Sequence, residues 1–362
     1  MFFFLPLLAL LELPGAAASQ EVSQEVSQEC YQGEEASWEL KRWVLTEVAV
    51  EEEEEEEERG GRRVKFYETE MFHLQPGGPG SASWYLLGDG WQGAYYYPSP
   101  SSPTSQGEER AGLYLYPDYY TAVLGQWRQH VLQTGQVTVL LSACREGAGW
   151  SLSWASPQSS SPAITYSPPS HFSYGVSPTS TDPYEARTVT VARSGTAEAN
   201  EGLFTVREVL AGEVVAFYSG LIINCESSLR ALDRRELSDE EEHERNMYNI
   251  ALDLGETDTD NLCIDIPPEM GGDTSKYSAT LAHKVNHNFQ PNSEFVLFSA
   301  HPVLGTIMAI TALEDLEAGV EITVNYGYNF TAEPDQPQWF KALWLEHYGD
   351  DEESGESGHQ EL

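Results

Sequence analysis

The chain has 362 residues, of which 58 are acidic and 19 are basic, so its formal net charge at pH 7 is -39. Charge of this sign repels a phosphate backbone over most of a surface, so the composition argues against direct nucleic-acid binding and favours basic peptides as partners. The hydrophobic content of 40% is enough for a sizeable core, and the length accommodates two ordinary domains with tails.

Residues 1–19 read as an apolar leader. The run from Phe2 to Leu11 and the small residues after it are typical of a secretory signal, but no basic residue precedes the run and Glu12 interrupts it. The run is too short to span a bilayer, so no transmembrane span is predicted. A cleaved signal peptide and a retained apolar leader both stay open.

Residues 20–64 are an acidic, low-complexity segment. They contain repeated Ser-Gln-Glu-Val units and an unbroken run from Glu51 to Glu58. Like charges at this density repel one another and cannot pack, so we expect a solvated tail or linker.

Residues 65–155 alternate glycines with short aromatic runs. The stretch from Gly88 to Pro98 is echoed by the stretch from Gly112 to Asp118, a pattern that predicts stacked antiparallel hairpins. The pattern resembles a degenerate array of MORN repeats, and a generic antiparallel sheet is the alternative. Residues 156–183 are rich in Ser and Pro, and we interpret them as a linker.

Residues 184–330 predict a second, mostly β domain. The predicted strands lie at Thr188 to Ala192, Glu213 to Tyr218, Thr306 to Ile310 and Val320 to Val324. Within this domain only the strongly charged stretch from Ser227 to Arg245 has a helical pattern.

Two histidines four residues apart, His283 and His287, raise the question of a metal site. A zinc protease of the usual type would have glutamate directly after the first histidine, where this chain has Lys284. No cysteine or aspartate lies close by, and the cysteines form no close-spaced pair. The four cysteines are Cys30, Cys144, Cys225 and Cys263. No metal site is predicted.

Four blocks of the second domain together resemble the SET-domain protein-lysine methyltransferases. In chain order they run from Ala199 to Phe204, from Phe217 to Gly220, from Asn286 to Asn292 and from Leu316 to Tyr328. The glycine- and aromatic-rich segment before them makes the type that combines MORN repeats with a SET domain the most similar. The resemblance implies a mostly β fold: an antiparallel MORN-like sheet region, then a SET domain of small twisted sheets with a pseudoknot, then a short carboxyl-terminal helix. Residues 331–362 would cover the cofactor and end in an acidic tail.

The resemblance implies transfer of a methyl group from S-adenosylmethionine to the ε-amine of lysine in histone tails or other basic proteins. The amine must arrive uncharged and aligned, and the displacement needs no metal. Tyr326 and Tyr218 would be the catalytic pair, with Phe295 and Tyr328 lining the lysine channel. We expect a nuclear or cytoplasmic, chromatin-associated protein, because a glycan at Asn329 after secretion would obstruct this channel. The sequence predicts no oligomeric state.

The same resemblance places the cofactor against two chain segments and one aromatic side chain. Main-chain groups at Ala199, Asn200 and Glu201 and at Asn286 and His287 would hold its amino acid and ribose parts. Trp339 would pack on its adenine.

Three positions depart from the family pattern. Asn200 stands where glycine is usual, and asparagine tolerates a positive φ. Leu343 stands where the most similar relatives have a carboxylate. These departures leave open a catalytically silent scaffold that acts as an acidic protein-binding module.

Phe295 is the third departure, because the monomethylating relatives have tyrosine there. Without that hydroxyl we expect a more permissive channel that reaches dimethyl-lysine. The acidic stretch from Ser238 to Arg245 is either a solvated loop or a surface that selects basic peptides.

Overall fold

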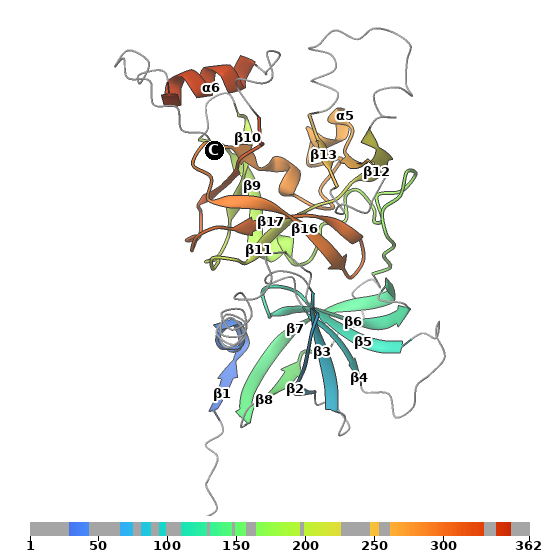
Figure 1. Ribbon diagram of the computed structural model, residues 1–362. Coiled ribbons are helices and arrows are strands. Elements are labelled where there is room, and N and C mark those ends of the chain that lie inside the picture. Colours follow the sequence, from blue (N-terminus) through green and yellow to red (C-terminus); the bar gives the residue numbers. More distant parts are fainter. Residues whose placement is uncertain are drawn as a thin grey trace, which may run out of the picture.

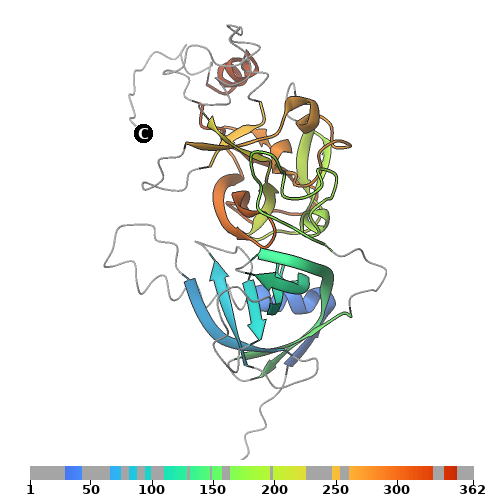
Figure 2. The same cartoon turned by 90° about the vertical axis from the view of Figure 1, so that its right-hand side faces the viewer.

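The protein is mostly β and consists of two packed bodies, shown here in a computed structural model (Figures 1 and 2). The structure describes residues 29–42, 66–74, 81–87, 94–98, 110–128, 131–146, 149–156, 164–195, 199–225, 247–252, 261–328 and 338–348. The acidic stretch and the predicted helix between residues 227 and 245 lie outside these residues.

The first body is a sheet that closes on itself. Its strands are β1 (Glu29–Gln32), β2 (Phe66–Leu74), β3 (Ser81–Leu87), β4 (Ala94–Pro98), β5 (Arg110–Leu115), β6 (Thr121–Arg128), β7 (Val131–Glu146) and β8 (Gly149–Trp154). From β2 to β7 each strand pairs antiparallel with the next, as the glycine-punctuated pattern predicts. β8 then pairs with both β7 and β2, and its pairing with β2 is parallel. Closure joins β8 to β2 and β7, and it leaves β1 as the strand with a single neighbour among the described residues. The MORN interpretation and the predicted domain boundaries remain predictions.

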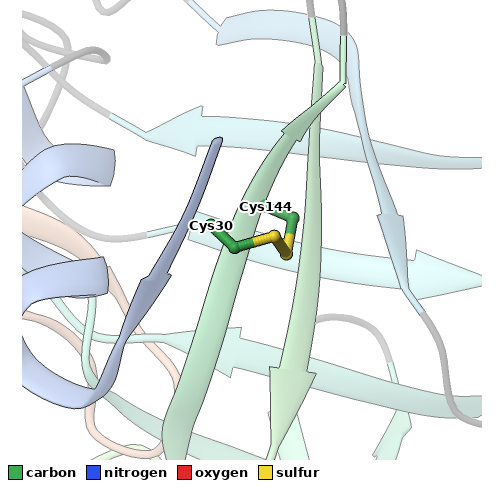
Figure 3. The surroundings of a disulfide bond; sticks show 2 residues. All are labelled: Cys30 and Cys144. Carbon is green, nitrogen blue, oxygen red and sulfur yellow. A yellow bond between two sulfur atoms is a disulfide. The ribbon is translucent and has the colours of Figure 1, made fainter. Parts of the chain in front are cut away.

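An amino-terminal segment packs against this ring. β1 pairs antiparallel with β7, and Cys30 lies opposite Cys144, to which it is joined by a disulfide (Figure 3). Residues 33–42 form a helix whose Ala36 and Leu40 are fully buried in the core of the ring. The prediction that all of residues 20–64 are solvated is therefore wrong for residues 29–42. The composition gave no sign of the helix, because few of its side chains are apolar and polar contacts such as the Lys41–Glu213 ion pair also hold it in place.

The second body contains small sheets. Its elements are α2 (Glu185–Thr188), β9 (Val189–Arg193), β10 (Glu201–Thr205), β11 (Val214–Tyr218), β12 (Leu221–Asn224), β13 (Asn249–Ala251), β14 (Leu262–Asp265), α5 (Pro268–Gly271), η1 (Ala282–Lys284), β15 (Asn286–His287), β16 (Ser293–His301), β17 (Gly305–Ala312) and β18 (Glu321–Val324). The sheet orders are β15-β18-β10-β9, β11-β17-β16 and β12-β14-β13. Each of the four predicted strand runs lies on a strand. A second disulfide, between Cys225 and Cys263, joins the end of β12 to β14.

The two bodies share one hydrophobic core. Tyr116 of the first body stacks on Tyr184 of the second, with ring centroids 5.6 Å apart. The Tyr116 hydroxyl donates a hydrogen bond to Asp182, and Phe217 contacts the His301 ring at 4.6 Å. One cluster of buried apolar side chains runs through both bodies. The second body therefore packs against the first through a continuous hydrophobic core.

A short carboxyl-terminal helix, α6 (Gln338–Tyr348), is present as predicted and lies on the far side of the second body from the ring (Figure 1). None of the described helices has both the length and the apolar character that a membrane crossing requires.

The two disulfides differ in the length of chain that they close. The partners are 114 residues apart for Cys30–Cys144 and 38 for Cys225–Cys263. On the chain-entropy model, removing the first pair by Cys30→Ser with Cys144→Ser costs about 1 kcal/mol more unfolding free energy than the matched change at Cys225 and Cys263. Urea denaturation of the two double variants measures this difference. A smaller loss for the first pair would show that the amino-terminal segment is not tied into the folded core.

Candidate active site

A buried carboxyl group aligns the two chain segments that build the site. Glu185 Oε1 accepts hydrogen bonds from the backbone N–H groups of Phe217, at 2.8 Å, and Leu281, at 3.0 Å. Phe217 directly precedes Tyr218 at the end of β11, and Leu281 directly precedes η1. Burial, with the nearby charge of Asp182, raises the pKa of Glu185 well above its ordinary value. The carboxyl group holds the two backbones together through these two hydrogen bonds.

The strand β15 lies beside the strand that leads to Tyr326. Asn286 pairs with Thr323 and His287 with Val324 in a parallel register, although about 35 residues separate the two strands. The backbone N–H of Tyr326 donates to His287 Nδ1 at 3.1 Å, and the Tyr326 hydroxyl donates to the Val285 carbonyl at 2.6 Å. These contacts place the segment that begins at Asn286 against Tyr326, the predicted catalytic tyrosine. A pseudoknot of the kind that the resemblance implies needs these two segments side by side.

The side chain of Asn286 has a fixed orientation. Its Nδ2 donates to Ser194 Oγ at 3.1 Å, to the Glu201 carbonyl at 2.9 Å and to Glu321 Oε1 at 2.9 Å. Its amide oxygen makes no hydrogen bond to any residue that the structure describes, so it is available to accept one from a ligand. A Cβ on Gly202 would lie 2.3 Å from Glu321 Oε1 and 3.0 Å from Asn286 Nδ2, so a side chain at this position would push on both groups. The arrangement suits recognition of an ammonium group.

The two candidate catalytic tyrosines differ in exposure. Tyr218 is buried, with 5% of its surface exposed, and Tyr326 is 39% exposed. Burial raises the pKa of both phenols, and each lies near other tyrosines that raise it further. Both are therefore neutral at neutral pH. Phe295 on β16 faces Tyr218, with ring centroids 6.3 Å apart.

Aromatic side chains from α6 cover the Tyr326 side of the site. Trp339 lies 6.0 Å from Tyr326, 5.9 Å from Tyr328 and 6.1 Å from His287, measured between ring centroids. Phe340 is buried and lies 5.3 Å from the His287 ring. Burial lowers the pKa of His287 to about 4, so its ring is neutral and serves as an acceptor for Tyr326.

The family model described as the SET domain matches residues 200–327, which include β10 through β18 and both tyrosines. The chain contains a SET domain.

Known proteins similar to this chain include a curated relative and several solved structures. A histone-lysine N-methyltransferase SETD7 from Halocynthia roretzi is 29% identical over 259 residues, which cover 68% of this chain. The chain spans 62% of the length of that relative.

The solved structures match at much lower overlap. One is "ctPRC2 in an autoinhibited conformation bound to S-adenosylmethionine", 21% identical with a TM-score of 0.28, covering 45% of this chain and 17% of that one. Another is a humanized mutant of the Chaetomium thermophilum Polycomb Repressive Complex 2 bound to the inhibitor GSK126, 22% identical with a TM-score of 0.28, covering 43% and 16%. Likenesses at this TM-score are too weak to inform the site.

The SET domain brings together most of the side chains that the sequence singled out. The turn at Ala199 and Asn200 reaches β9, because the Asn200 carbonyl accepts from the backbone N–H of Ser194 at 3.4 Å. Among the described residues other than glycine only Tyr119 has a positive φ, so Asn200 needs no left-handed conformation. The Glu201 side chain forms an ion pair with Lys284 at 2.7 Å. The sequence predicted a role only for the main chain of Glu201, so this side-chain contact was not expected.

Three further side chains near the site were not predicted from the sequence. Glu321 on β18 and Ser194, which directly follows β9, orient Asn286, and no sequence motif marked either of them for this role. Tyr248 packs on the His283 ring, which Tyr218 also contacts, and it lies within a stretch that carries no recognisable pattern. Over the described part of the chain no group of three or more His, Cys, Asp or Glu side chains is placed to hold a metal ion.

Glu321 offers a test of the Asn286 orientation. Glu321→Gln removes the negative charge that accepts a hydrogen bond from the Asn286 side-chain amide. A charge-assisted hydrogen bond of this kind contributes about 1.5–3 kcal/mol, so the amide is held less firmly in the variant. We expect roughly tenfold weaker binding of the cofactor that the resemblance implies. Isothermal titration of the variant measures it, with Glu314→Gln at an exposed position as the matched control. Equal affinities for the two variants would mean that Glu321 plays no part in the cofactor site.

Proposed function

We propose that this chain transfers a methyl group from S-adenosylmethionine to the ε-amine of lysine in basic protein substrates, of which histone tails are the expected class. The observation that carries the proposal is the parallel pairing of β15 with β18. It places Asn286 and His287 against Tyr326, while Glu185 holds the end of β11, which carries Tyr218, beside Leu281 in the turn before η1.

The residues present fit the cofactor. The free amide oxygen of Asn286 suits its ammonium group, the turn at residues 199–201 offers backbone groups, and Trp339 offers an aromatic face. When bound, S-adenosylmethionine supplies an electrophilic methyl group. We keep Ala199, Asn200, Glu201, Asn286, His287 and Trp339 as the proposed cofactor residues.

The chain's own contribution is to hold a lysine amine neutral and aligned. Aromatic walls disfavour the ammonium form, because a buried charge loses its water, and the substrate's proton leaves to solvent. The neutral phenols of Tyr218 and Tyr326 can then accept hydrogen bonds from the amine N–H groups, which points the nitrogen lone pair at the methyl group. Phe295 and Tyr328 form the apolar sides of the channel.

Charge favours basic substrates. The net charge of -39 attracts peptides rich in Lys and Arg and speeds their encounter with the surface. A role in chromatin regulation is part of this proposal.

A catalytically silent scaffold is the alternative, and Leu343 is the observation that favours it. Leu343 lies on α6 one turn after Trp339 and offers no polar group to a cofactor. The two functions differ in one measurable property, because a scaffold has no need to bind the cofactor.

The test is isothermal titration of the full chain with S-adenosylmethionine, together with methylation of mixed core histones. The full chain is needed, because residues 29–42 belong to the core. We expect micromolar binding, and loss of at least about 100-fold in rate in Tyr326→Phe, the size of effect that one positioned proton-transfer or orienting group typically has. Tyr120→Phe, which removes a hydroxyl from the first body, is the matched control. Absence of binding would establish the scaffold instead.

The proposed localisation is nuclear or cytoplasmic, where such substrates occur. Disulfides form and persist mainly in oxidising compartments. We therefore expect all four cysteines of the protein isolated from cells to be reduced, whereas the protein purified in air carries both disulfides. Alkylation before lysis followed by mass spectrometry counts the thiols. Two intact disulfides in the cellular protein would place it in the secretory pathway.

A further inference from the structure

The hydroxyl of Tyr218 makes no hydrogen bond within the part of the chain that the structure describes. The tyrosine ring packs edge to face on His283 and on Phe295, with ring centroids 6.4 Å and 6.3 Å apart. The place of the phenol is therefore set by these ring contacts and by the backbone on either side of Tyr218.

Ser219, the residue directly after Tyr218, has all of its polar groups bound. Its backbone N–H donates to Thr280 Oγ1 at 3.0 Å, and its carbonyl accepts from the Tyr277 hydroxyl at 2.6 Å. Its own Oγ lies 3.0 Å from each of these two hydroxyl oxygens. All three residues are fully buried. Two hydroxyl groups of one chain segment thus hold the residue that follows the catalytic tyrosine.

The direction of each hydrogen bond in this network follows from the number of protons. The Tyr277 hydroxyl gives its one proton to the Ser219 carbonyl, so Ser219 Oγ is the donor in its contact with Tyr277. Thr280 Oγ1 is then the donor in its contact with Ser219 Oγ. Every hydroxyl proton is used, and a buried network with all its groups paired is stiff. Removal of one member leaves another buried group unpaired.

The residue before Tyr218 is held by the same stretch of chain. The backbone N–H of Phe217 donates to Glu185 Oε1 at 2.8 Å, and the same oxygen accepts from the backbone N–H of Leu281 at 3.0 Å. Leu281 directly follows Thr280. The backbone of Tyr218 is therefore fixed on both sides relative to residues 280–281.

Tyr277 also supports the ring of Tyr218. Its own ring packs edge to face on the imidazole of His283, with centroids 5.3 Å apart, and Tyr218 packs on the same imidazole. Burial, with the charge of Lys284, lowers the pKa of His283 to about 3, so the imidazole is neutral. Tyr277 thus reaches both the backbone after Tyr218 and the side chain against which the Tyr218 ring lies.

We propose that Thr280 and Tyr277 are positioning residues for methyl transfer, because their hydroxyls hold Ser219 and so set where the Tyr218 phenol meets the substrate amine. This inference rests on the proposed methyltransferase function. Transfer requires close alignment of the amine with the methyl group, and small displacements lower the rate of the step more than they lower binding. The cofactor is expected to contact other segments, at residues 199–201 and 286–287.

The experiment measures kcat, KM and S-adenosylmethionine affinity of the full chain with mixed core histones. Thr280→Val keeps the shape of the side chain and removes the hydroxyl, which leaves the Ser219 N–H unpaired. We expect kcat to fall about tenfold, as the loss of one orienting hydrogen bond implies, with cofactor affinity unchanged. Thr280→Ser, which returns a hydroxyl, should restore the wild-type kcat.

A double-variant cycle separates positioning from a purely structural role. When two residues act through the same group, their effects on kcat do not add. Adding Thr280→Val to Tyr218→Phe should therefore cause no further loss of kcat, since the phenol that Thr280 positions is already absent. An equal loss in the wild-type and Tyr218→Phe backgrounds would show that Thr280 only supports the fold, and would overturn the inference.

Tyr277→Phe tests the network from its other end. It removes the hydroxyl that binds the Ser219 carbonyl but keeps the ring on His283. We expect the same fall in kcat as in Thr280→Val, and this variant decides the question if Thr280→Val does not fold.

Thr138→Val is the matched control. Thr138 lies on β7 of the first body, is buried, and its hydroxyl donates to the Ala155 carbonyl at 2.5 Å. This variant should keep the wild-type kcat. Wild-type kcat in Thr280→Val and Tyr277→Phe as well overturns the inference and leaves the methyltransferase function intact. Cofactor binding without any methylated product in the wild type overturns both.

Discussion

The site depends on the buried carboxyl group of Glu185. Two chain segments that are more than 60 residues apart, the end of β11 and the turn before η1, present backbone N–H groups to a single oxygen. An unpaired N–H in this interior would cost a large part of a hydrogen bond, so the two segments are held in one relative position. Tyr218 follows one of them, and His283, Asn286 and His287 follow the other.

A second buried group ties the amino-terminal helix to this frame. Glu213 forms ion pairs with Lys41 at 2.8 Å and with Arg207 at 2.6 Å. Burial alone would raise the pKa of Glu213, but the two cations lower it overall, so the group is charged and paired. Buried ion pairs contribute little net stability but are costly to break, which makes them better at specifying one packing than at strengthening it. The helix at residues 33–42 is thus fixed in position against β11.

The sequence located those segments of the fold that short local motifs mark. Tyr218, Asn286, His287 and Tyr326 lie in contiguous blocks, and alternation of apolar residues located the strands that carry them. The antiparallel run of the first body likewise follows from glycine turns between neighbouring strands.

It failed where the deciding partner is distant in the chain. No local signal marks the parallel pairing of β8 with β2, the burial of Leu40 or the pairing of the four cysteines, because each depends on a contact across many residues. Tyr248 was missed for the same reason. It lies outside the four sequence blocks of the second domain, and only the fold brings it to His283.

The disulfide in Figure 3 joins two cysteines that are made far apart in time. At typical rates of synthesis Cys144 follows Cys30 after roughly 6–23 s, and until then β1 lacks the β7 segment with which it pairs. Four cysteines allow three pairings, yet here the first joins the second and the third joins the fourth. Each native bond therefore joins cysteines that are consecutive in the chain, so folding of the reduced protein sets the pairing that later oxidation in air fixes.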